Sequence, residues 1–128
     1  KTTAFDMAIL GLRILKDFPD ESRVFSQKEF IFEGNTYRSH NKLLFSYPGT
    51  KGMKTGFTNM SGFNLISYVM KENKEIISVV MGGSSSISRN SNMVKVLNKS
   101  IKLAKYEIPF PKSNPFIEQK KINLKYYF

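Results

Sequence analysis

Residues 52–62, GMKTGFTNMSG, hold the side chains of this sequence that are best suited to chemistry. If Met53–Thr58 forms a β-strand, alternation sends Lys54 and Thr55 to opposite faces. A pocket on one face could not use both, but a cleft along the edge of a sheet could, because an edge strand also has free backbone N–H and C=O groups. Gly56 has no side chain, so an extended peptide could lie beside it and add a strand to the sheet. The alternative interpretation is a solvated lysine followed by a turn glycine.

The elements that must position this strand begin with a predicted helix, TTAFDMAILGLRILKDFP. Thr2 or Thr3 can cap its N-terminus, Asp6 in the first turn suits the helix dipole, and Pro19 ends it. Its apolar residues recur at helical spacing and spread over a wide stripe, so we expect burial on most sides of the helix. These residues are Phe5, Met7, Ala8, Ile9, Leu10, Leu12, Ile14 and Leu15.

Four further runs are predicted to be strands. Glu29–Phe32 and Thr36–Arg38 form a small hairpin, with Gly34-Asn35 as the expected tight turn. After the Lys54 strand come Asn64–Met70 and Ile76–Met81, which are joined as a second hairpin. The last run is nearly all apolar, which predicts a central strand.

An amphipathic helix follows the loop GGSSSISRNS. Its apolar face contains Met93, Leu97, Ile101 and Ala104, and its polar face contains Lys95, Lys99 and Lys102. The order helix, hairpin, three strands, helix predicts an α+β fold with an antiparallel sheet flanked by helices. Three strands make a small sheet, so we expect more strands in the intact fold.

Composition limits the class of protein and excludes several kinds of site. The 128 residues are 41% hydrophobic, which predicts one ordered domain. There is no cysteine, which excludes disulfides and thiolate metal sites, and the single His40 cannot build a histidine-rich site. We therefore expect no metal and no cofactor. No apolar run approaches the roughly 18 residues that a membrane-spanning helix needs.

The net charge of +10 is compatible with an anionic partner such as nucleic acid, anionic lipid or a cell-wall polymer. The lysines are scattered rather than clustered in a patch. Lysine, asparagine and isoleucine are all frequent, as AT-rich coding would give, so codon usage is the simpler explanation. We expect no nucleic-acid partner, because no recognition motif accompanies the charge.

The flanks of the Lys54 strand carry a more specific pattern. PGTKGMKTGFTNMSGFNLI resembles the third signature of the serine penicillin-recognising enzymes, specifically the low-molecular-mass D-alanyl-D-alanine carboxypeptidases of serine peptidase family S11. That family has a Gly-x-Lys-Thr-Gly-x-Thr strand before a small-Gly-aromatic-Asn-Leu segment, here Gly52–Thr58 and Ser61–Leu65. The first helix, the hairpin with its Asn-x-Leu-Leu end and the Met-Gly-Gly strand end are also similar, over residues 2–106. Class A β-lactamases share the Lys-Thr-Gly strand but fit the hairpin and the Met-Gly-Gly end worse.

The resemblance implies roles for individual residues. Lys54 would supply positive charge beside the nucleophile, assist proton transfer and anchor the substrate. Thr55, with Gly56 beside it, would bind the terminal carboxylate of D-Ala-D-Ala or of a β-lactam. The backbone N–H of Phe57 would be an oxyanion-hole donor, a contribution worth about 10²–10³ in rate. Arg89 aligns with a basic loop residue implicated in carboxylate recognition, which suits a bidentate guanidinium; the alternative is a solvated loop arginine.

The family's nucleophile is expected to lie outside this chain. It is a Ser-x-x-Lys at the start of a helix, and a Ser-x-Asn completes the proton relay. Ser39-His40-Asn41-Lys42 satisfies both patterns, but roughly two Ser-x-x-Lys matches are expected by chance, and this one falls in the hairpin segment. Because the chain begins at Lys1 rather than at methionine, we expect a piece of a longer protein.

The resemblance therefore implies a partial β-lactamase/transpeptidase-like fold. Residues 1–106 would be the C-terminal half of a catalytic domain, and 107–128 a linker or the start of a following segment. The implied function is a serine-type carboxypeptidase that trims peptidoglycan stem peptides, here without its nucleophile. The alternative is a non-catalytic module that binds peptidoglycan peptides. The family implies export to the periplasm or cell envelope, with anchoring to the membrane through parts outside this chain.

Overall fold

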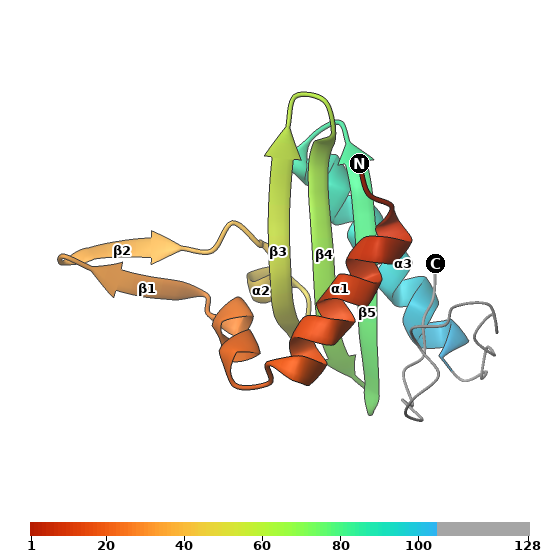
Figure 1. Ribbon diagram of the computed structural model, residues 1–128, viewed down its shortest axis with the longest axis horizontal. Helices are drawn as coiled ribbons and strands as arrows, with labels where there is room; N and C mark the ends of the chain where they lie inside the picture. Colours follow the sequence, from red (N-terminus) through yellow and green to blue (C-terminus); the bar gives the residue numbers. More distant parts are fainter. Residues whose placement is uncertain (105–128) are drawn as a thin grey trace.

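The computed structural model describes residues 1–104 and contains three α-helices, one 3-10 helix and five strands. Figure 1 shows their arrangement. In chain order they are α1 (Ala4–Asp17), η1 (Glu21–Ser26), β1 (Glu29–Phe32), β2 (Asn35–Arg38), α2 (Leu43–Ser46), β3 (Thr50–Thr58), β4 (Gly62–Lys71), β5 (Lys74–Gly83) and α3 (Ser86–Leu103). The predicted segment 107–128 lies outside the described residues.

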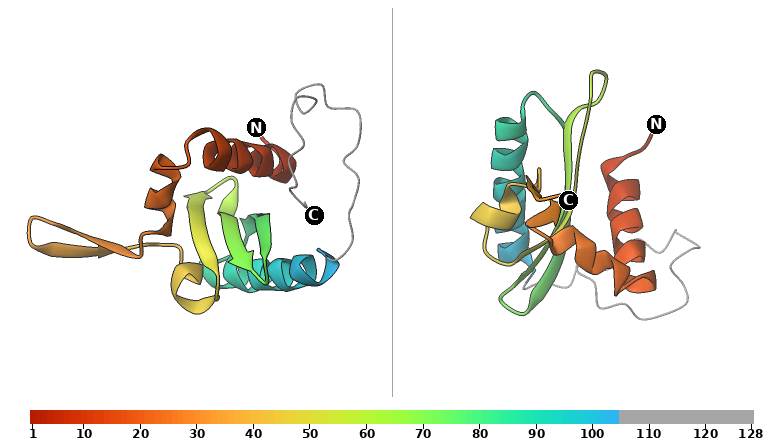
Figure 2. Two further views of the ribbon diagram at one scale, coloured as in Figure 1. Left: turned by 90° about the horizontal axis from the view of Figure 1, so that it is seen from below. Right: turned by 90° about the vertical axis from the view of Figure 1, so that its left-hand side faces the viewer.

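The central feature is an antiparallel sheet of three strands in the order β3-β4-β5. Helices α1 and α3 cover its two faces, so the described part has three layers, which Figure 2 shows edge-on. The second sheet is the two-stranded hairpin β1-β2, which projects away from the layers (Figure 1). This arrangement confirms the predicted α+β class with helices flanking an antiparallel sheet.

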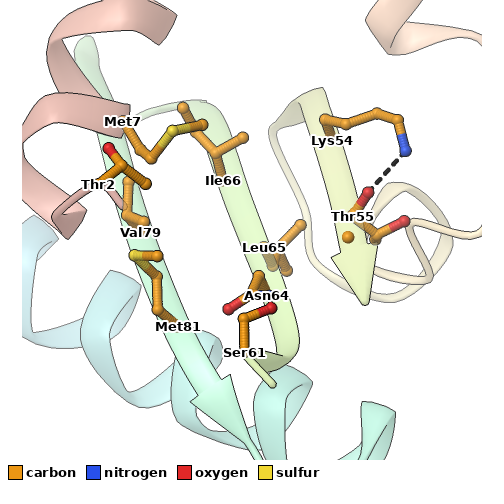
Figure 3. Close-up of a pocket in the computed structure, with 11 residues that line it drawn as sticks. Thr2, Met7, Lys54, Thr55, Ser61, Asn64, Leu65, Ile66, Val79 and Met81 are labelled. Carbon is orange, nitrogen blue, oxygen red and sulfur yellow. Dashed lines mark hydrogen bonds between the residues drawn. The ribbon is translucent and has the colours of Figure 1, made fainter. Parts of the chain in front are cut away.

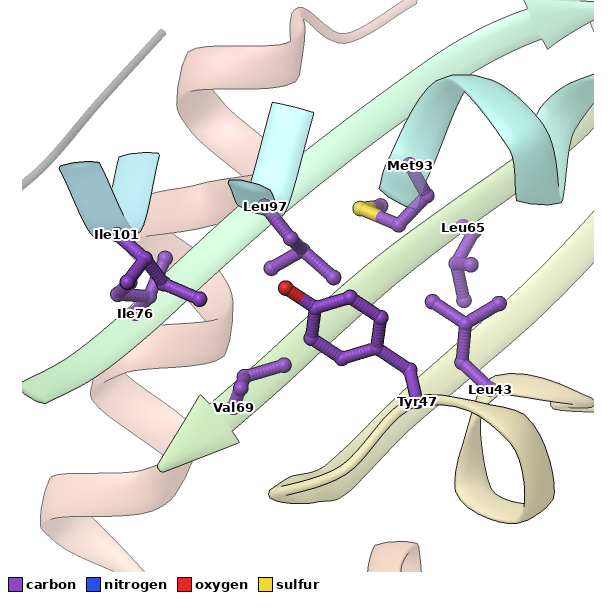
Figure 4. Packing of buried hydrophobic residues seen from close by; sticks show 8 residues of the cluster. All are labelled: Leu43, Tyr47, Leu65, Val69, Ile76, Met93, Leu97 and Ile101. Carbon is purple, nitrogen blue, oxygen red and sulfur yellow. The ribbon is translucent and has the colours of Figure 1, made fainter. Parts of the chain in front are cut away.

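One core lies between the sheet and α3 (Figure 4). The predicted apolar face of α3 is buried there, and the lysine face is exposed. The single-turn helix α2 closes the end of this core, and the hydroxyl of Tyr47 donates a hydrogen bond to Asn98 Oδ1 at 2.7 Å. The cluster consists of Leu43, Tyr47, Leu65, Val69, Ile76, Met93, Leu97 and Ile101.

A smaller core lies between the sheet and α1, built from Ala8, Leu12, Met53, Ile66 and Ile77. The prediction that α1 is buried on most sides is wrong. Its outer side faces solvent, and Leu10 is 51% exposed. In the described residues α1 packs on the sheet along one side only. Part of its wide apolar stripe therefore stays outside this core.

The prediction that Ile76–Met81 is the central strand is also wrong, because β4 lies between β3 and β5. β5 is apolar for a different reason: α3 packs on one of its faces and α1 on the other. A continuous apolar run therefore indicates that both faces of a strand are buried. It does not indicate that the strand has a neighbouring strand on each edge.

The turn of the β1-β2 hairpin is one residue earlier than predicted. Phe32 pairs with Asn35, so the turn residues are Glu33 and Gly34, with φ of 50° and 75°. Positive φ at both central residues is the geometry that suits a two-residue hairpin. The whole hairpin is exposed, and the rings of Phe30 and Tyr37 stack on each other at 5.1 Å.

Candidate active site

The Lys54 strand is an edge strand of the sheet. In the described part of the chain β3 pairs only with β4, and the register places Lys54 opposite Ile66, Thr55 opposite Leu65 and Gly56 opposite Asn64. β3 begins three residues before the predicted start, at Thr50. Its other edge has no strand partner in the described residues, and η1 packs beside the first half of the strand, where Phe25 lies against Gly52. The second half, from Lys54 to Thr58, is the part where an extended chain could add a strand.

A cleft of about 290 Å³ opens on the strand ends beside the start of α1. Figure 3 shows residues from β3, β4, β5 and α1 around it. Lys54, Thr55 and Gly56 all line this cleft. Because residues of β4, β5 and the start of α1 line it as well, it lies across the strand ends and not along the free edge of β3, where the sequence predicts a cleft. The other lining residues are Thr2, Met7, Ser61, Asn64, Leu65, Ile66, Val79 and Met81.

Lys54 is exposed, and its Nζ donates a hydrogen bond to the backbone carbonyl of Thr55 at 2.6 Å (Figure 3). Among residues 1–104, no carboxylate forms an ion pair with this ammonium. An unneutralised cation beside a mostly apolar cleft is suited to attract an anionic group of a ligand.

Gly56 lines the cleft, whereas Phe57 does not. A Cβ built on Gly56 would contact nothing within 4 Å, so the space beside it is open. Phe57 is not among the lining residues, and its ring packs on Phe63 with the centroids 4.5 Å apart. The proposed role of Phe57 concerns its backbone N–H and stays a prediction.

The structure places Arg89 in helix α3 rather than in a loop, and only 4% of its surface is exposed. The predicted loop ends early because Ser85 caps the helix and forms a reciprocal capping box with Ser88. The guanidinium donates to Asn90 Oδ1 through Nε and Nη2, at 3.0 and 2.8 Å, and to the Asn64 carbonyl through Nη1 at 3.4 Å. Burial lowers the pKa of Arg89 from its ordinary value.

The alternative interpretation of Arg89, as a solvated loop arginine, is wrong. The side chain is not solvated, and it does not line the cleft. Its Nη1 donates instead to the backbone carbonyl of Asn64, a residue that does line the cleft. Its role in carboxylate recognition therefore stays a prediction.

Asn64 lines the cleft, although its residue type and spacing predict no role for it. Its side chain bonds to Ser61, Gly62 and Gly82, on the turn, on β4 and on β5. The available signal was its place in the Ser-Gly-Phe-Asn-Leu segment. Nothing in the local pattern shows that its amide reaches another strand.

The Ser39-x-x-Lys42 match is not part of this cleft. Ser39 follows β2, and its hydroxyl accepts a hydrogen bond from the Asn41 N–H at 3.2 Å, which forms a local turn. The helix that follows is the single turn α2, so the helix start required of a Ser-x-x-Lys nucleophile is absent here.

Residues 1–104 contain no group of three or more His, Asp or Glu side chains that could hold a metal ion. No helix in the same residues is both long and apolar enough to cross a membrane.

Comparison with known proteins places this fold and strand in one family. The family model for D-alanyl-D-alanine carboxypeptidase, Peptidase_S11, matches residues 1–85. The chain is 34% identical over 97 residues to D-alanyl-D-alanine carboxypeptidase DacA of Escherichia coli strain K12, covering 75% of this chain and 24% of the relative. It is 32% identical over 120 residues to DacC of the same strain, covering 93% and 30%.

Solved structures agree with these relatives. Penicillin binding protein 5 from Haemophilus influenzae superposes with a TM-score of 0.73 at 35% identity, covering 79% of this chain and 30% of that one. Penicillin-Binding Protein D2 from Listeria monocytogenes, in its cefotaxime-bound form, gives 0.70 at 26% identity, covering 76% and 40%.

The chain spans 24–30% of the length of these two curated relatives. Within that span the elements follow the penicillin-binding protein fold, and the Lys54 strand lies at the edge of the sheet with a cleft beside it. The chain therefore belongs to the D-alanyl-D-alanine carboxypeptidase family, peptidase family S11.

Proposed function

We propose that the protein containing this chain is a serine-type D-Ala-D-Ala carboxypeptidase that trims peptidoglycan stem peptides through an acyl-enzyme. Residues 1–106 are, in this proposal, the C-terminal half of its catalytic domain, and 107–128 lead into a following segment. The observation that carries the proposal is the placement of Lys54, Thr55 and Gly56 on a free edge strand that lines one cleft.

The edge strand supplies the substrate-binding wall of the site. An extended peptide ending in D-Ala-D-Ala lies along β3, close to the open surface of Gly56, and its terminal carboxylate is bound by Thr55 and attracted by Lys54. The same groups hold the carboxylate of a β-lactam. The L. monocytogenes relative is known in a cefotaxime-bound form, which supports a β-lactam as a ligand of this fold.

The chemistry needs a nucleophile that the family carries in its Ser-x-x-Lys segment. Its oxygen adds to the carbonyl of the D-Ala-D-Ala peptide bond, and the negative charge that develops on the carbonyl oxygen is stabilised by the Phe57 N–H. The C–N bond then breaks, the terminal D-alanine leaves after receiving a proton, and water hydrolyses the acyl ester. Lys54 lowers the energy of the anionic intermediate and assists proton transfer to and from the serine.

The second candidate function is a peptidoglycan-peptide-binding module without catalysis. It is favoured by the observation that an edge strand with a cleft beside it needs no nucleophile to bind an extended peptide. In this case the edge strand binds the peptide and no acyl-enzyme forms.

Labelling with a fluorescent penicillin distinguishes the two functions. The complete protein containing this chain is expected to form a covalent adduct, whereas the isolated 128-residue chain is expected to form none. A complete protein that binds the peptide but is never labelled would support the binding module.

In the labelled protein, Lys54→Ala is expected to lower the acylation rate by at least about 10², the scale of losing one electrostatic contribution to the transition state. Lys51→Ala is the matched control, because Lys51 is an exposed lysine of the same strand that does not line the cleft. Equal loss in both variants would show a general charge effect and contradict the assigned role of Lys54.

The same proposal places the protein in the periplasm or cell envelope, exported and anchored to the cytoplasmic membrane through parts outside this chain. Cell fractionation with an antibody against this chain tests the location. Recovery in the cytoplasmic fraction would contradict it.

A further inference from the structure

The sheet has an irregularity at Asn64, a residue of the central strand β4 whose side chain reaches β5. Phe63 pairs with Gly83 but Leu65 pairs with Val80, so one residue of β4 lies opposite two residues of β5. A bulge of this kind interrupts the ladder and leaves backbone groups in need of other partners. The Gly82 N–H at the bulge donates instead to Asn64 Oδ1, at 3.0 Å.

The amino group of the same side chain holds the turn between β3 and β4. Asn64 Nδ2 donates to Ser61 Oγ and to the Gly62 carbonyl, both at 2.9 Å. The Ser61 hydroxyl is in turn 2.7 Å from Thr58 Oγ1, which also accepts the Ser61 N–H at 2.9 Å. A continuous set of hydrogen bonds therefore runs from the end of β3 through the turn to the end of β5.

The orientation of this amide is determined by its partners. Gly62 offers only a carbonyl and Gly82 only an N–H at these contacts, so a flipped amide would oppose donor to donor and acceptor to acceptor. The side chain thus has one arrangement that satisfies both neighbours. Networks of this kind, when every member is satisfied, specify local geometry.

Asn64 also lies between the groups assigned to the site. It is the register partner of Gly56, and its backbone carbonyl accepts the hydrogen bond from Arg89 Nη1. Its side chain lines the cleft (Figure 3). A shift of this residue would move the Lys54 strand relative to Arg89 and relative to the end of β5.

We infer that Asn64 is a positioning residue for the proposed carboxypeptidase site, whose amide sets the position of the Lys54–Thr58 strand end against β5. The inference rests on the proposed function. Its role is to align the wall of the site, and it takes no part in proton transfer. Misplacement of reacting groups by about 1 Å can cost on the order of 10² in rate. We therefore expect a change of Asn64 to lower the rate constant of the chemical step more than it weakens binding of the ligand.

The test measures acylation of the complete protein by a fluorescent penicillin, separating the acylation rate constant at saturation from the noncovalent dissociation constant. Asn64→Leu removes both sets of hydrogen bonds at similar volume. It is expected to lower the rate constant by about 10- to 100-fold and to change the dissociation constant by less than about threefold. Asn98→Leu is the control, since it removes the hydrogen bond to Tyr47 at a distance from the cleft, and it is expected to keep the wild-type rate constant.

Ser61→Ala keeps the test decisive if Asn64→Leu fails to fold. It removes only the hydroxyl that joins Asn64 to Thr58, and it is expected to lower the rate constant by a smaller factor. Where both single variants fold, the double variant is expected to lose no more than Asn64→Leu alone, because members of one network are not additive.

The outcomes separate this inference from the function on which it rests. A wild-type protein that is never acylated overturns the proposed function and this inference with it. A wild-type protein that is acylated, with variants of Asn64 and Ser61 that react at its rate, overturns only the positioning role. The same holds if Asn98→Leu lowers the rate constant as much as Asn64→Leu does.

Discussion

At the scale of single residues, Gly49, just before β3, and Gly56, within it, lack a side chain for different reasons. Gly49 has a φ of +86°, and a Cβ there would clash with the Met70 carbonyl oxygen. Gly56 has neither restriction, since its surroundings are empty within 4 Å. The described fold therefore gives no internal reason for glycine at position 56, whereas a peptide lying along β3 would give one.

This contrast makes Gly56→Ala informative. We expect the free energy of unfolding of the variant to differ from that of the wild type by no more than about 0.5–1 kcal/mol. Alanine is compatible with an extended strand, and it restricts the unfolded chain more than glycine does. We also expect slower acylation by a penicillin, because the added methyl group occupies the space of the ligand. Thermal unfolding and labelling of the complete protein measure the two effects.

Gly49→Ala is the matched control, with clear destabilisation expected from its positive φ and its clash with backbone. Gly56→Ala with the wild-type acylation rate would show that no ligand backbone approaches this position.

The residues of the site were predictable to different degrees. Lys54, Thr55 and Gly56 follow one another in a strand, so their common location on one edge follows from local sequence. The run of serines before Arg89 predicts a loop, whereas in the structure Ser85 and Ser88 form a capping box that starts the helix earlier. The contact of Asn64 with Gly82 depends on the register of β4 and β5, which no local pattern specifies.

At the scale of elements, α1 shows how a short polar motif sets the start of a helix beside the cleft. The Thr3 hydroxyl accepts the Asp6 N–H at 3.1 Å, and Asp6 Oδ2 accepts the Thr3 N–H at 3.0 Å. The Thr3 hydroxyl also donates to Asp6 Oδ2, at 2.8 Å. This bond, followed by the one from the Thr3 N–H, holds the pKa of the Asp6 carboxyl below its ordinary value of 3.8. The predicted choice of Thr2 or Thr3 as cap is thereby settled in favour of Thr3.

The sign of the pH effect follows from this direction. A carboxyl whose pKa is lowered by folding stabilises the folded state above its unfolded pKa, and the contribution is lost as the pH falls through the folded value. We expect Asp6→Asn to be less stable than the wild type at neutral pH, with a difference that shrinks as the pH falls below 3.8. Urea unfolding of the complete protein over this range measures it.

Asp20→Asn is the control for this pH series, because Asp20 makes only a solvent-exposed ion pair with Arg23 and such pairs contribute little. A difference for Asp6→Asn that stays constant down to acid pH would show that the carboxylate charge is not what stabilises the helix start.

The strands show which part of the fold the sequence could specify. Alternation and turn residues located every strand, but the place of each strand in the sheet is a property of pairing. β5 was predicted to be central from its apolar run, and it is apolar because α1 and α3 cover both faces. The position of the hairpin turn was missed by one residue because Glu33, a residue that seldom adopts positive φ, occupies a turn position.

At the scale of the whole molecule, the described residues leave an unpaired strand edge and a group of apolar side chains exposed to solvent. Within residues 1–104, β5 has no strand partner beyond β4, and the β1-β2 hairpin exposes Phe30, Ile31 and Phe32. Ile31 is 75% exposed. Unpaired strand edges and contiguous exposed apolar side chains both promote association between chains.

We therefore expect the isolated 128-residue chain to self-associate, as measured by light scattering over a range of concentrations. Ile31→Lys is expected to reduce association if the hairpin is the contact and to leave it unchanged if the edge of β5 is. A concentration-independent monomer would contradict the expectation for both surfaces.

The central position of β4 has a consequence for the motions of the site. Its backbone has strand partners on both sides, and Leu65 and Val69 are almost fully buried, so exchange of its hydrogen-bonded amides with solvent requires the sheet to open. The outward amides of β3 have no such protection in the described fold, and they exchange without any opening. The strand proposed to receive the substrate thus has one unprotected edge beside the slowest-exchanging strand of the sheet, and a bound peptide should protect the amides along that edge.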